Sequence, residues 1–262
     1  MWDFEHAPSD AELALRYRID RMSPAACADR LADGTSDIGL IPIAALAGNP
    51  SLRIMPGSTI ASKGHVRSLL LVRRASQPLT AVRTVAADIA SRTTLAYARI
   101  LFHKWGNPTV PFVPASADLD AMLEKADAAI LIGDPALLAL EEQENRLERT
   151  SEQLIYHDLA YEWRSLTGLP FVSAVWCASA ACPLDDRIIG DFNQSRIHGL
   201  QHIEALAAEW LRKMPVPEST IRTYLSHNIH YTLDKECVEG MNGFFRAASE
   251  LSILPSYTPR FE

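Results

Sequence analysis

The chain has 262 residues, of which 48% are hydrophobic and 22% are charged, a balance typical of a globular protein with one large domain or two lobes. Its formal net charge of -7 argues against a general nucleic-acid binder, because no basic stripe is present to neutralise phosphates. The apolar stretches are far too short to span a membrane, and residues 1–6 lack the basic head and apolar run of a secretory signal.

The first third of the chain predicts one helix and three short strands. Ser23 and Pro24 are typical of a helix start, and Gly34 is typical of a helix end. Apolar runs predict strands at 37–42, 54–57 and 68–72. We expect a helical stretch at 43–46 and a polar loop over 58–67, in which Gly64 permits either a turn or a close approach to a ligand.

After a linker at 77–79, short apolar runs alternate with amphipathic stretches. This pattern predicts strands at 82–87, 109–114 and 128–132, with helices at 92–105, 117–126 and 135–146. Such an alternation implies right-handed crossovers and a parallel sheet, whose ligands bind beyond the carboxyl ends of the strands. The rest of the chain predicts a helix at 158–167, a long strand at 169–178 and a mainly helical tail over 183–254.

Ser91, Arg92, Thr93 and Thr94 form the first turn of a helix that comes after the strand at 82–87. Such a turn favours an anion, because hydroxyls, unpaired N–H groups and the helix dipole all point toward it. We therefore expect this turn to bind a substrate carboxylate. The alternative is that Ser91 only caps its helix.

Gly133 and Asp134 come directly after the strand at 128–132 and are expected to line the same cleft. Asp134 is the best carboxylate for that cleft, because a strand end followed by a proline projects it outward. Its alternative role is to cap the helix that begins at Pro135.

The sequence gives little support for a metal or a cofactor. His198 and His202 lie four residues apart and His227 and His230 three apart, but neither pair has a His-Glu-x-x-His context, so we expect surface or packing histidines and no metal. No P-loop, nucleophile elbow or dinucleotide fingerprint is present, so we expect no cofactor. The four cysteines have no Cys-x-x-Cys spacing and indicate free thiols in a reducing cytoplasm.

Five stretches of the chain carry a family pattern. They are Asp-Ile-Gly-Leu-Ile-Pro at 37–42, Ile-Ala-Ser-Lys-Gly-His-Val-Arg-Ser-Leu-Leu-Leu at 60–71, Asp-Ile-Ala-Ser-Arg-Thr-Thr at 88–94, Ala-Ala-Ile-Leu-Ile-Gly-Asp at 128–134 and Glu-Trp-Arg-Ser-Leu-Thr-Gly-Leu-Pro-Phe-Val at 162–172. Together, and in this order, they resemble the chorismate dehydratase family of menaquinone biosynthesis by the futalosine route.

The resemblance implies an α/β protein with the two-lobed periplasmic-binding-protein type II fold, used as a cytoplasmic enzyme. Lobe one would comprise residues 1–79 and 173–262, and lobe two residues 80–172. The implied activity is that of a carbon–oxygen lyase, which removes water from chorismate and gives 3-[(1-carboxyvinyl)oxy]benzoate. Aromatisation drives this reaction, so the enzyme mainly has to hold a dianion, exclude water and manage one proton transfer. Chorismate is the partner that the resemblance implies, and the sequence gives no oligomeric state.

The resemblance also assigns site residues. Ser91, Arg92, Thr93 and Thr94 would bind a substrate carboxylate. Ser62 and Ser68 would face them from the other lobe, and Gly133 and Asp134 would lie at the cleft wall. The catalytic residue is left unassigned, with Asp134 as a candidate, and a substrate carboxylate is an alternative internal base because strong acid–base residues are scarce in the matched stretches.

The N-terminus departs from the family pattern. Family members begin with a strand and a Ser-x-Leu-Asn-x-x-Pro-Leu segment whose asparagine belongs to the active site, whereas residues 1–5 resemble the part of the family pattern directly after that segment. We expect a misplaced start codon or a shortened chain. We also expect the 262-residue chain to be inactive or poorly stable, because loss of that strand would leave two unpaired edges in the sheet of lobe one.

Two other functions fit the same resemblance. One is a non-catalytic solute-binding protein of the same fold that delivers a small carboxylate to a transporter. The other is the sister enzyme of the pathway that cleaves a futalosine derivative, which is disfavoured because the turn at 91–94 and the segment at 163–172 resemble the dehydratase more closely.

Overall fold

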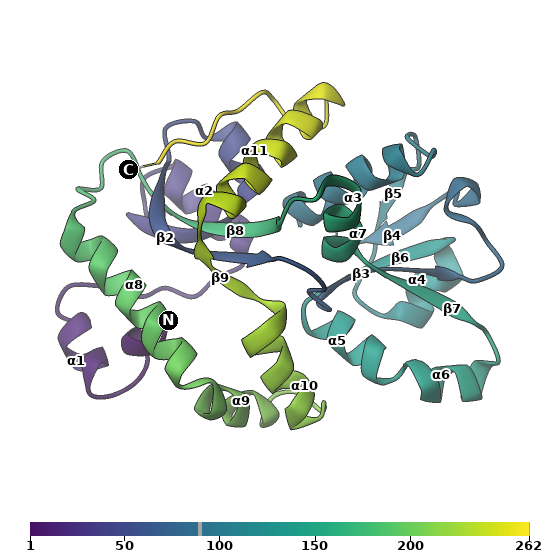
Figure 1. Ribbon diagram of the computed structural model, residues 1–262, viewed down its shortest axis with the longest axis horizontal. Coiled ribbons are helices and arrows are strands. Elements are labelled where there is room, and N and C mark those ends of the chain that lie inside the picture. Colours follow the sequence, from purple (N-terminus) through teal and green to yellow (C-terminus); the bar gives the residue numbers. More distant parts are fainter. Residues whose placement is uncertain (89–90, 262) are drawn as a thin grey trace.

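The computed structural model describes residues 1–88 and 91–261 and has two lobes, each with one β-sheet (Figure 1). The strand order is β1-β8-β2-β9 in the first sheet and β5-β4-β6-β3-β7 in the second. The strands are β1 (Ile38–Pro42), β2 (Arg53–Ser62), β3 (Leu69–Arg74), β4 (Val85–Ala87), β5 (Phe112–Pro114), β6 (Ala128–Ile132), β7 (Leu154–Asp158), β8 (Phe171–Ala178) and β9 (His230–Leu233). The predicted two-lobed α/β architecture is confirmed.

Helices surround both sheets. They are η1 (Trp2–Phe4), α1 (Ser9–Leu13), α2 (Pro24–Ala32), η2 (Ile43–Gly48), η3 (Leu79–Ala81), α3 (Arg92–Lys104), α4 (Leu119–Lys125), α5 (Asp134–Glu141), α6 (Gln143–Thr150), α7 (Leu159–Thr167), α8 (Asp186–Gln201), α9 (Ile203–Leu211), α10 (Glu218–Thr223), η4 (Tyr224–Asn228) and α11 (Lys235–Glu250). None of these helices, in the parts of the chain that the structure describes, is both long and apolar enough to cross a membrane.

The four-stranded sheet is antiparallel and is centred on β8 and β2. β8 pairs with β1 on one side, where Ile41 lies opposite Val175, and with β2 on the other, where Ile60 lies opposite Ala174. In Figure 1, α11 lies above this sheet and α8 lies below it. The four strands pair consecutively, so this sheet has no internal gap among the described residues, and its two edge strands are β1 and β9.

β2 is longer than its apolar run predicts. The expected loop over 58–67 is wrong in its first half, because the strand continues to Ser62. The polar side chains in this stretch are buried but have partners: the Ser58 hydroxyl donates to Asn193 Oδ1 over 2.8 Å, and the Thr59 hydroxyl donates to the Ala174 carbonyl over 2.8 Å. Satisfied hydroxyls allow a polar segment to remain in a buried strand.

The five-stranded sheet is mixed, which corrects the expected parallel sheet. β4, β5 and β6 are parallel, as the alternating pattern predicts, but β3 runs antiparallel to both β6 and β7. The physical reason is the route of the chain, because β3 enters from the first lobe at the edge where β4 and β6 end. β3 thus belongs to the second sheet although it lies in the range 1–79 expected for lobe one, and the exact lobe boundaries stay a prediction.

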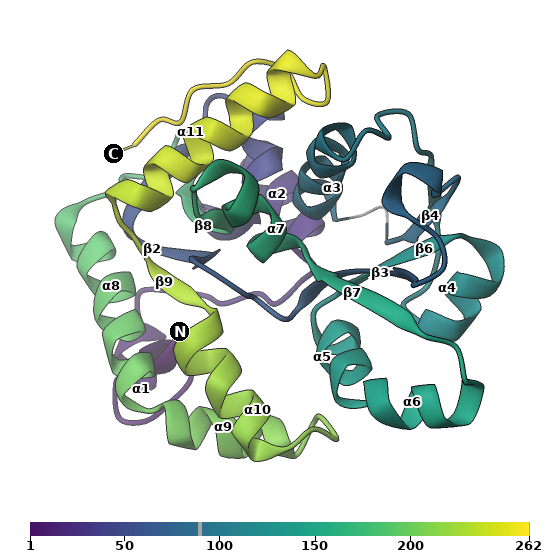
Figure 2. The same ribbon diagram turned by 45° about the vertical axis from the view of Figure 1, so that its right-hand side comes forward.

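The lobes share one hydrophobic core behind the strand ends. Tyr97 of α3 stacks on Phe171 of β8 with ring centroids 3.8 Å apart, and its hydroxyl accepts from the Val172 N–H over 3.3 Å. Figure 2 shows α3, α7 and α11 side by side at this junction. Lobe two is therefore anchored to lobe one through the helix that begins at Arg92.

Most of the predicted elements are present with shifted ends. α2 is confirmed, with the Ser23 hydroxyl accepting from the Ala26 N–H, and β6 spans the predicted residues. The helix expected at 135–146 is instead two helices, α5 and α6, that meet at Glu142. The strands β7 and β9 were missed, because their runs are short and carry charged or histidine side chains.

Candidate functional site

Several strand ends of the second sheet meet at one edge. The register places Ala87 beside Ile130, and Leu69 beside Ile132, so the residues after β4 and β6 lie next to the start of β3. The Gly133 N–H donates to the Ser68 carbonyl over 2.7 Å. The structure therefore brings Ser68, Gly133 and Asp134 together, with the start of α3 one strand away.

The turn at Ser91–Thr94, which we call the α3 turn, is polar but enclosed. Ser91 occupies the N-cap position of α3, yet its side chain accepts no helix N–H and instead donates to Thr94 Oγ1 over 3.1 Å. Thr93 and Thr94 are each 4% exposed, whereas Arg92 is exposed to solvent. The interpretation of Ser91 as a mere helix cap is thus wrong. The matched stretch at 88–94 also contains Ile89 and Ala90, which lie outside the described residues.

Thr93 connects the α3 turn to the other lobe. Its hydroxyl oxygen accepts from the buried Ala44 N–H over 3.1 Å, and Ala44 lies in η2, directly after β1. This hydrogen bond spans the junction between the lobes. It was not predictable from either segment alone, because 49 residues separate the partners.

Gly133 and Asp134 have roles that differ from the expected cap. Gly133 itself is the N-cap of α5, with a φ of +71° that favours glycine, and Asp134 is the first helical residue. Asp134 does not cap the helix that was expected to begin at Pro135, because it is itself the first residue of that helix and Gly133 occupies the N-cap position. Its exposed carboxylate lies near Tyr224 at the strand edge.

Tyr224 is a member of this site that sequence reasoning missed. It begins η4, a single π-helical turn, and its hydroxyl donates to Ser68 Oγ over 3.0 Å. Burial raises the pKa of Tyr224, and the nearby Asp134 carboxylate raises it further, so the phenol stays neutral and remains a donor. The π-helical turn is the local feature that marks Tyr224 as a candidate site residue, because such turns are frequent at functional sites. No sequence motif predicts this turn.

Ser62 is the last residue of β2, where the segment that crosses to the second lobe begins, and it is not at the strand ends of the second sheet. It is 2% exposed, and its hydroxyl donates to the Gly64 carbonyl over 3.1 Å, so Gly64 serves a turn. Further along the same segment, Arg67 has a left-handed φ of +64°, and its N–H donates to Asp158 Oδ2 over 2.6 Å. Asp158 also caps α7, which fixes the crossing segment to the end of β7.

A titratable cluster lies where the crossing segment meets α11. The Lys63 ammonium lies 2.6 Å from Asp234 Oδ2 and 2.8 Å from Glu236 Oε2. Burial alone would raise the pKa of Asp234, but Lys63 and the Cys237 N–H hold it well below its usual range. His230 and Cys237 place ligand atoms within 4.8 Å of this carboxylate. The structure thus groups three metal-ligand types there, with Lys63 bound where a cation would lie.

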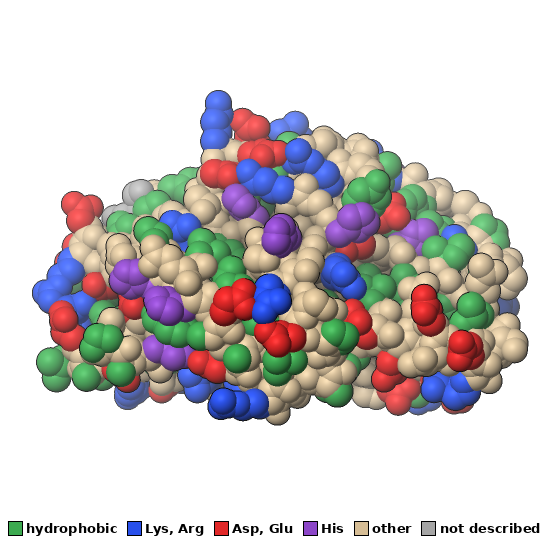
Figure 3. Space-filling model, turned by 60° about the horizontal axis from the view of Figure 1, so that its bottom comes forward, with side chains coloured by type: hydrophobic (Ala, Val, Ile, Leu, Met, Phe, Trp, Pro, Cys, Tyr) green, Lys and Arg blue, Asp and Glu red, His purple; other side chains and the backbone are tan. Residues whose placement is uncertain are grey.

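The other histidine pair is engaged in hydrogen bonds within the first lobe. His198 Nδ1 lies 2.8 Å from Asp3 Oδ2, and His202 Nδ1 lies 2.7 Å from the His198 carbonyl. Figure 3 shows histidine, acidic, basic and hydrophobic side chains interspersed on the lower face of the molecule. The expectation of packing histidines fits these contacts, and the absence of a metal stays a prediction.

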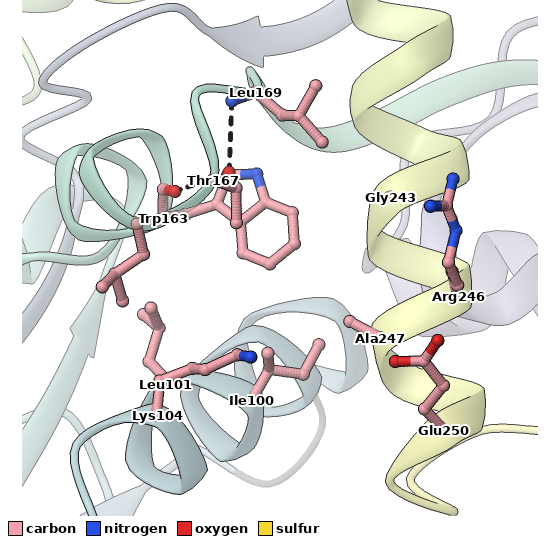
Figure 4. Close-up of a pocket in the computed structure, with 11 residues that line it drawn as sticks. Ile100, Leu101, Lys104, Trp163, Thr167, Leu169, Gly243, Arg246, Ala247 and Glu250 are labelled. Atoms are coloured by element: carbon pink, nitrogen blue, oxygen red, sulfur yellow. Dashed lines mark hydrogen bonds between the residues drawn. The ribbon is translucent and has the colours of Figure 1, made fainter.

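Two pockets lie away from the α3 turn. One, of about 200 Å³, lies between α3, α7 and α11, with Trp163 and Leu101 in its wall (Figure 4). Its charged side chains, Lys104, Arg246 and Glu250, are exposed. The other, of about 160 Å³, lies between the four-stranded sheet and α8, and we call it the α8 pocket. Its lining includes Leu40, Ile60, Trp176, Arg196, Ile203 and Leu206.

Comparison with solved structures identifies the fold. The chain is similar to a protein from Archaeoglobus fulgidus (14% identity, TM-score 0.63, covering 89% of this chain and 86% of that one). It is also similar to the alkanesulfonate-binding protein of Xanthomonas axonopodis pv. citri (15%, TM-score 0.62, 90% and 83%) and to a Candida albicans protein with the generic periplasmic-binding-protein fold (11%, TM-score 0.53, 89% and 84%). These likenesses establish the expected periplasmic-binding-protein-like fold.

Sequence comparison identifies the family. The chain is 27% identical over 217 residues to the chorismate dehydratase of Thermus thermophilus, an alignment that covers 80% of this chain and 78% of that protein. Residues 2–250 match the family described as menaquinone biosynthesis. This match spans nearly the whole chain, including both lobes and the α3 turn, so the protein belongs to the menaquinone biosynthesis family.

Proposed function

We propose that this protein is a chorismate dehydratase, which converts chorismate to 3-[(1-carboxyvinyl)oxy]benzoate. The observation that carries the proposal is the family match over residues 2–250, together with a relative of that name at 27% identity. The five sequence stretches that resemble the dehydratase family lie within this match and support the same assignment. The enclosed hydroxyl groups at the junction between the lobes supply a chemically suitable site.

The α3 turn would bind one carboxylate of the dianion. The positive end of the α3 dipole and the hydroxyls of Ser91 and Thr94 favour a negative group, and α3 is thirteen residues long, so its dipole is fully developed. Arg92 is exposed at the same turn and adds positive charge. Binding one end of the substrate in this way would fix the ring relative to the strand edge.

The opposite side of the site would be formed by Ser68, Tyr224 and Asp134. The neutral Tyr224 phenol donates to Ser68 and leaves the Ser68 hydroxyl able to donate to a substrate oxygen. Asp134 is the exposed carboxylate at this edge, whereas Asp158 is occupied by three backbone N–H groups. In this proposal the proton acceptor is a carboxylate of chorismate itself, because no buried protein base lies free among the predicted site residues that the structure describes.

Substrate entry requires the lobes to move apart. Thr93 and Thr94 are each 4% exposed, so a molecule the size of chorismate reaches them only when the junction opens. Opening would break the Thr93–Ala44 hydrogen bond, and closure would exclude water from the reacting ring. The carboxylate bound at the α3 turn would then help to hold the two lobes together, which is the role of the Ala44–Thr93 hydrogen bond in the closed form.

The direct test is incubation of the purified chain with chorismate, with the aromatic product monitored by absorbance and mass. Appearance of an aromatic product that has lost one water supports the proposal. Failure of the chain to turn over chorismate, with tight binding of another small acid, would instead support a solute-binding function.

A double substitution tests the role of the α3 turn. Thr93→Ala with Thr94→Ala should weaken chorismate binding at least tenfold, because it removes one hydroxyl that would bind the carboxylate and one that joins the two lobes. Thr109→Ala is the matched control, since Thr109 is exposed and lies outside the site. Unchanged chorismate affinity in the double variant would reduce the α3 turn to a structural element.

A further inference from the structure

The α8 pocket lies on the face of the first sheet that α8 and α9 cover. The register places Leu40 beside Trp176 and Ser58 beside Thr232 on this face. Ile203 and Leu206 of α9 close the pocket from the other side, so most of its wall is apolar. None of the predicted substrate-binding residues lines it, and it is therefore distinct from the α3 turn.

Arg196 places a cation in this apolar wall. It lies on α8, and its Nη1 donates to Thr232 Oγ1 over 2.9 Å. Its Nε is buried without a hydrogen-bond partner, and no ion pair involves Arg196 within residues 1–88 and 91–261. Burial lowers the pKa of Arg196, with no carboxylate opposing the shift. A partly buried guanidinium without a counter-ion is unfavourable unless something compensates its charge.

Three other polar side chains in the wall already have hydrogen-bond partners, and Tyr231 adds a phenol whose pKa is raised by burial, so it carries no charge. The Ser58 hydroxyl donates to Asn193, the Thr59 hydroxyl donates to the Ala174 carbonyl, and Ser195 Oγ accepts from the Asp3 N–H. The guanidinium is thus the charged side chain of the wall that retains free donors. Its planar fork matches a carboxylate better than any neutral acceptor.

The size of the pocket defines the rest of the ligand. Its volume is about 160 Å³, and apolar cavities of about 150 Å³ hold a benzene ring. We propose that the α8 pocket binds a small aromatic monocarboxylate, with the ring against Trp176 and Leu206 and the carboxylate on Arg196. This inference goes beyond the proposed dehydratase activity, and it does not depend on it.

Benzoate is the probe, and its binding is measured by calorimetry and by the NMR signal of the Trp176 indole N–H, which a Trp176→Phe variant assigns. We expect benzoate to bind, to shift that signal, and to lose at least tenfold in affinity in Arg196→Met. Benzamide, which has the same shape without the charge, should bind at least tenfold more weakly. Arg187→Met is the matched control, because Arg187 is an exposed arginine on the same helix and does not line the pocket.

Separate variants distinguish the α8 pocket from the two other places where an anion could bind. The Thr93→Ala, Thr94→Ala variant and a Lys104→Met variant should both bind benzoate as tightly as the unmodified chain. Loss of binding in either variant, an unshifted Trp176 signal, equal affinity for benzamide, or full affinity in Arg196→Met would each overturn the inference. Because no step uses chorismate turnover, these outcomes are independent of the proposed function.

Discussion

The α3 turn and the α8 pocket both contain polar groups among apolar residues, and they differ in whether those groups have hydrogen-bond partners within the protein. At the α3 turn, Thr93 holds the Ala44 N–H and Thr94 holds the Ser91 hydroxyl. At the α8 pocket, Arg196 has one hydroxyl partner and a buried Nε without any. The first place is satisfied by the protein itself, and the second is left unsatisfied.

This difference separates stability from binding in the two places. A substitution of Thr93 removes the acceptor of a buried N–H group, so it should lower the free energy of unfolding as well as substrate affinity. A substitution of Arg196 removes a charge that the folded state does not compensate, so it should change binding without lowering stability. Substitutions in both places test this contrast, beginning with the largest expected effect.

Thr93→Val should destabilise the protein by about 1–3 kcal/mol, because it leaves the buried Ala44 N–H without an acceptor. The side chains are nearly the same size, so the loss reports the hydroxyl. Urea unfolding monitored by circular dichroism measures the change. Thr109→Val, at an exposed position, is the control and should stay within about 0.5 kcal/mol of the unmodified chain.

A Thr93→Val variant as stable as this control would contradict the contrast. The Thr93–Ala44 hydrogen bond would then contribute nothing to the closed arrangement of the lobes. The polar groups of the α3 turn, like Arg196 in the α8 pocket, would then not stabilise the folded protein. Turnover of chorismate by the same variant should fall together with its stability margin if closure is required for the reaction.

Ser91→Ala should cost only a few tenths of a kcal/mol, in contrast to an N-cap serine that makes its hydrogen bond. Ser23 is such a cap, because its side chain accepts from the Ala26 N–H, and Ser23→Ala should cost about 0.5–2 kcal/mol. Ser91 occupies the equivalent position on α3 without capping it. Thermal unfolding of the two variants compares them directly, and equal losses would restore the interpretation of Ser91 as a structural cap.

The comparison of these two serines also shows how far a local sequence pattern reaches. The same signal, a serine before a helical stretch, predicted Ser23 as an N-cap and offered capping as the alternative role of Ser91, and both serines do occupy the N-cap position. Whether a serine hydroxyl bonds to a helix N–H depends on its neighbours. The Ser91 hydroxyl donates to Thr94 Oγ1 instead, and a local sequence pattern does not predict which of these partners it takes. Element positions were therefore predictable, whereas hydrogen-bond roles were not.

The site shows the same limit at longer range. Gly133 and Asp134 were predicted to line a cleft because strand ends meet at a sheet edge, and the structure places them at that edge. Ser68 was assigned from the resemblance and was expected to face the α3 turn from the other lobe, which is wrong, because it directly precedes β3 of the second sheet and its carbonyl accepts from Gly133. Tyr224 and Ala44 were missed, since Tyr224 lies 156 residues from its partner Ser68 and Ala44 belongs to the other lobe. Contacts that only the tertiary fold creates carry no sequence signal in a single chain.

A smaller effect should come from the segment that covers the α8 pocket. Trp2 stacks between His6 and His202 at 3.8 and 4.2 Å, and Met1 lines the pocket. Burial tends to lower the pKa of His6, but hydrogen bonds with Glu209 and the Trp2 carbonyl outweigh it, so the pKa lies above its ordinary 6.5. Protonated His6 therefore stabilises the folded state.

This raised pKa sets the sign of a pH dependence. The contribution of His6 should be fully present below pH 6.5 and should be lost as the pH rises through the higher folded-state pKa. It should amount to less than about 1 kcal/mol, because the pair is partly exposed. Urea unfolding at a series of pH values measures it, and Glu209→Gln should flatten the slope; an unchanged slope in His6→Gln would assign it to another group.

Arg196→Met should leave the free energy of unfolding within about 0.5 kcal/mol of the unmodified chain, or raise it slightly. The methionine keeps most of the apolar stem, and only the Thr232 hydrogen bond is lost against the removal of an uncompensated charge. Arg146 is the matched counterexample, a buried arginine with Asp120 at 2.7 Å and Glu152 at 2.8 Å. Arg146→Met should cost about 1.5–3 kcal/mol, because hydrogen bonds to charged groups are lost. If Arg196→Met is equally destabilising, the guanidinium is a structural group. If the free energy of unfolding of Arg196→Met is unchanged while its affinity for benzoate falls, Arg196 stabilises a bound anion rather than the folded chain.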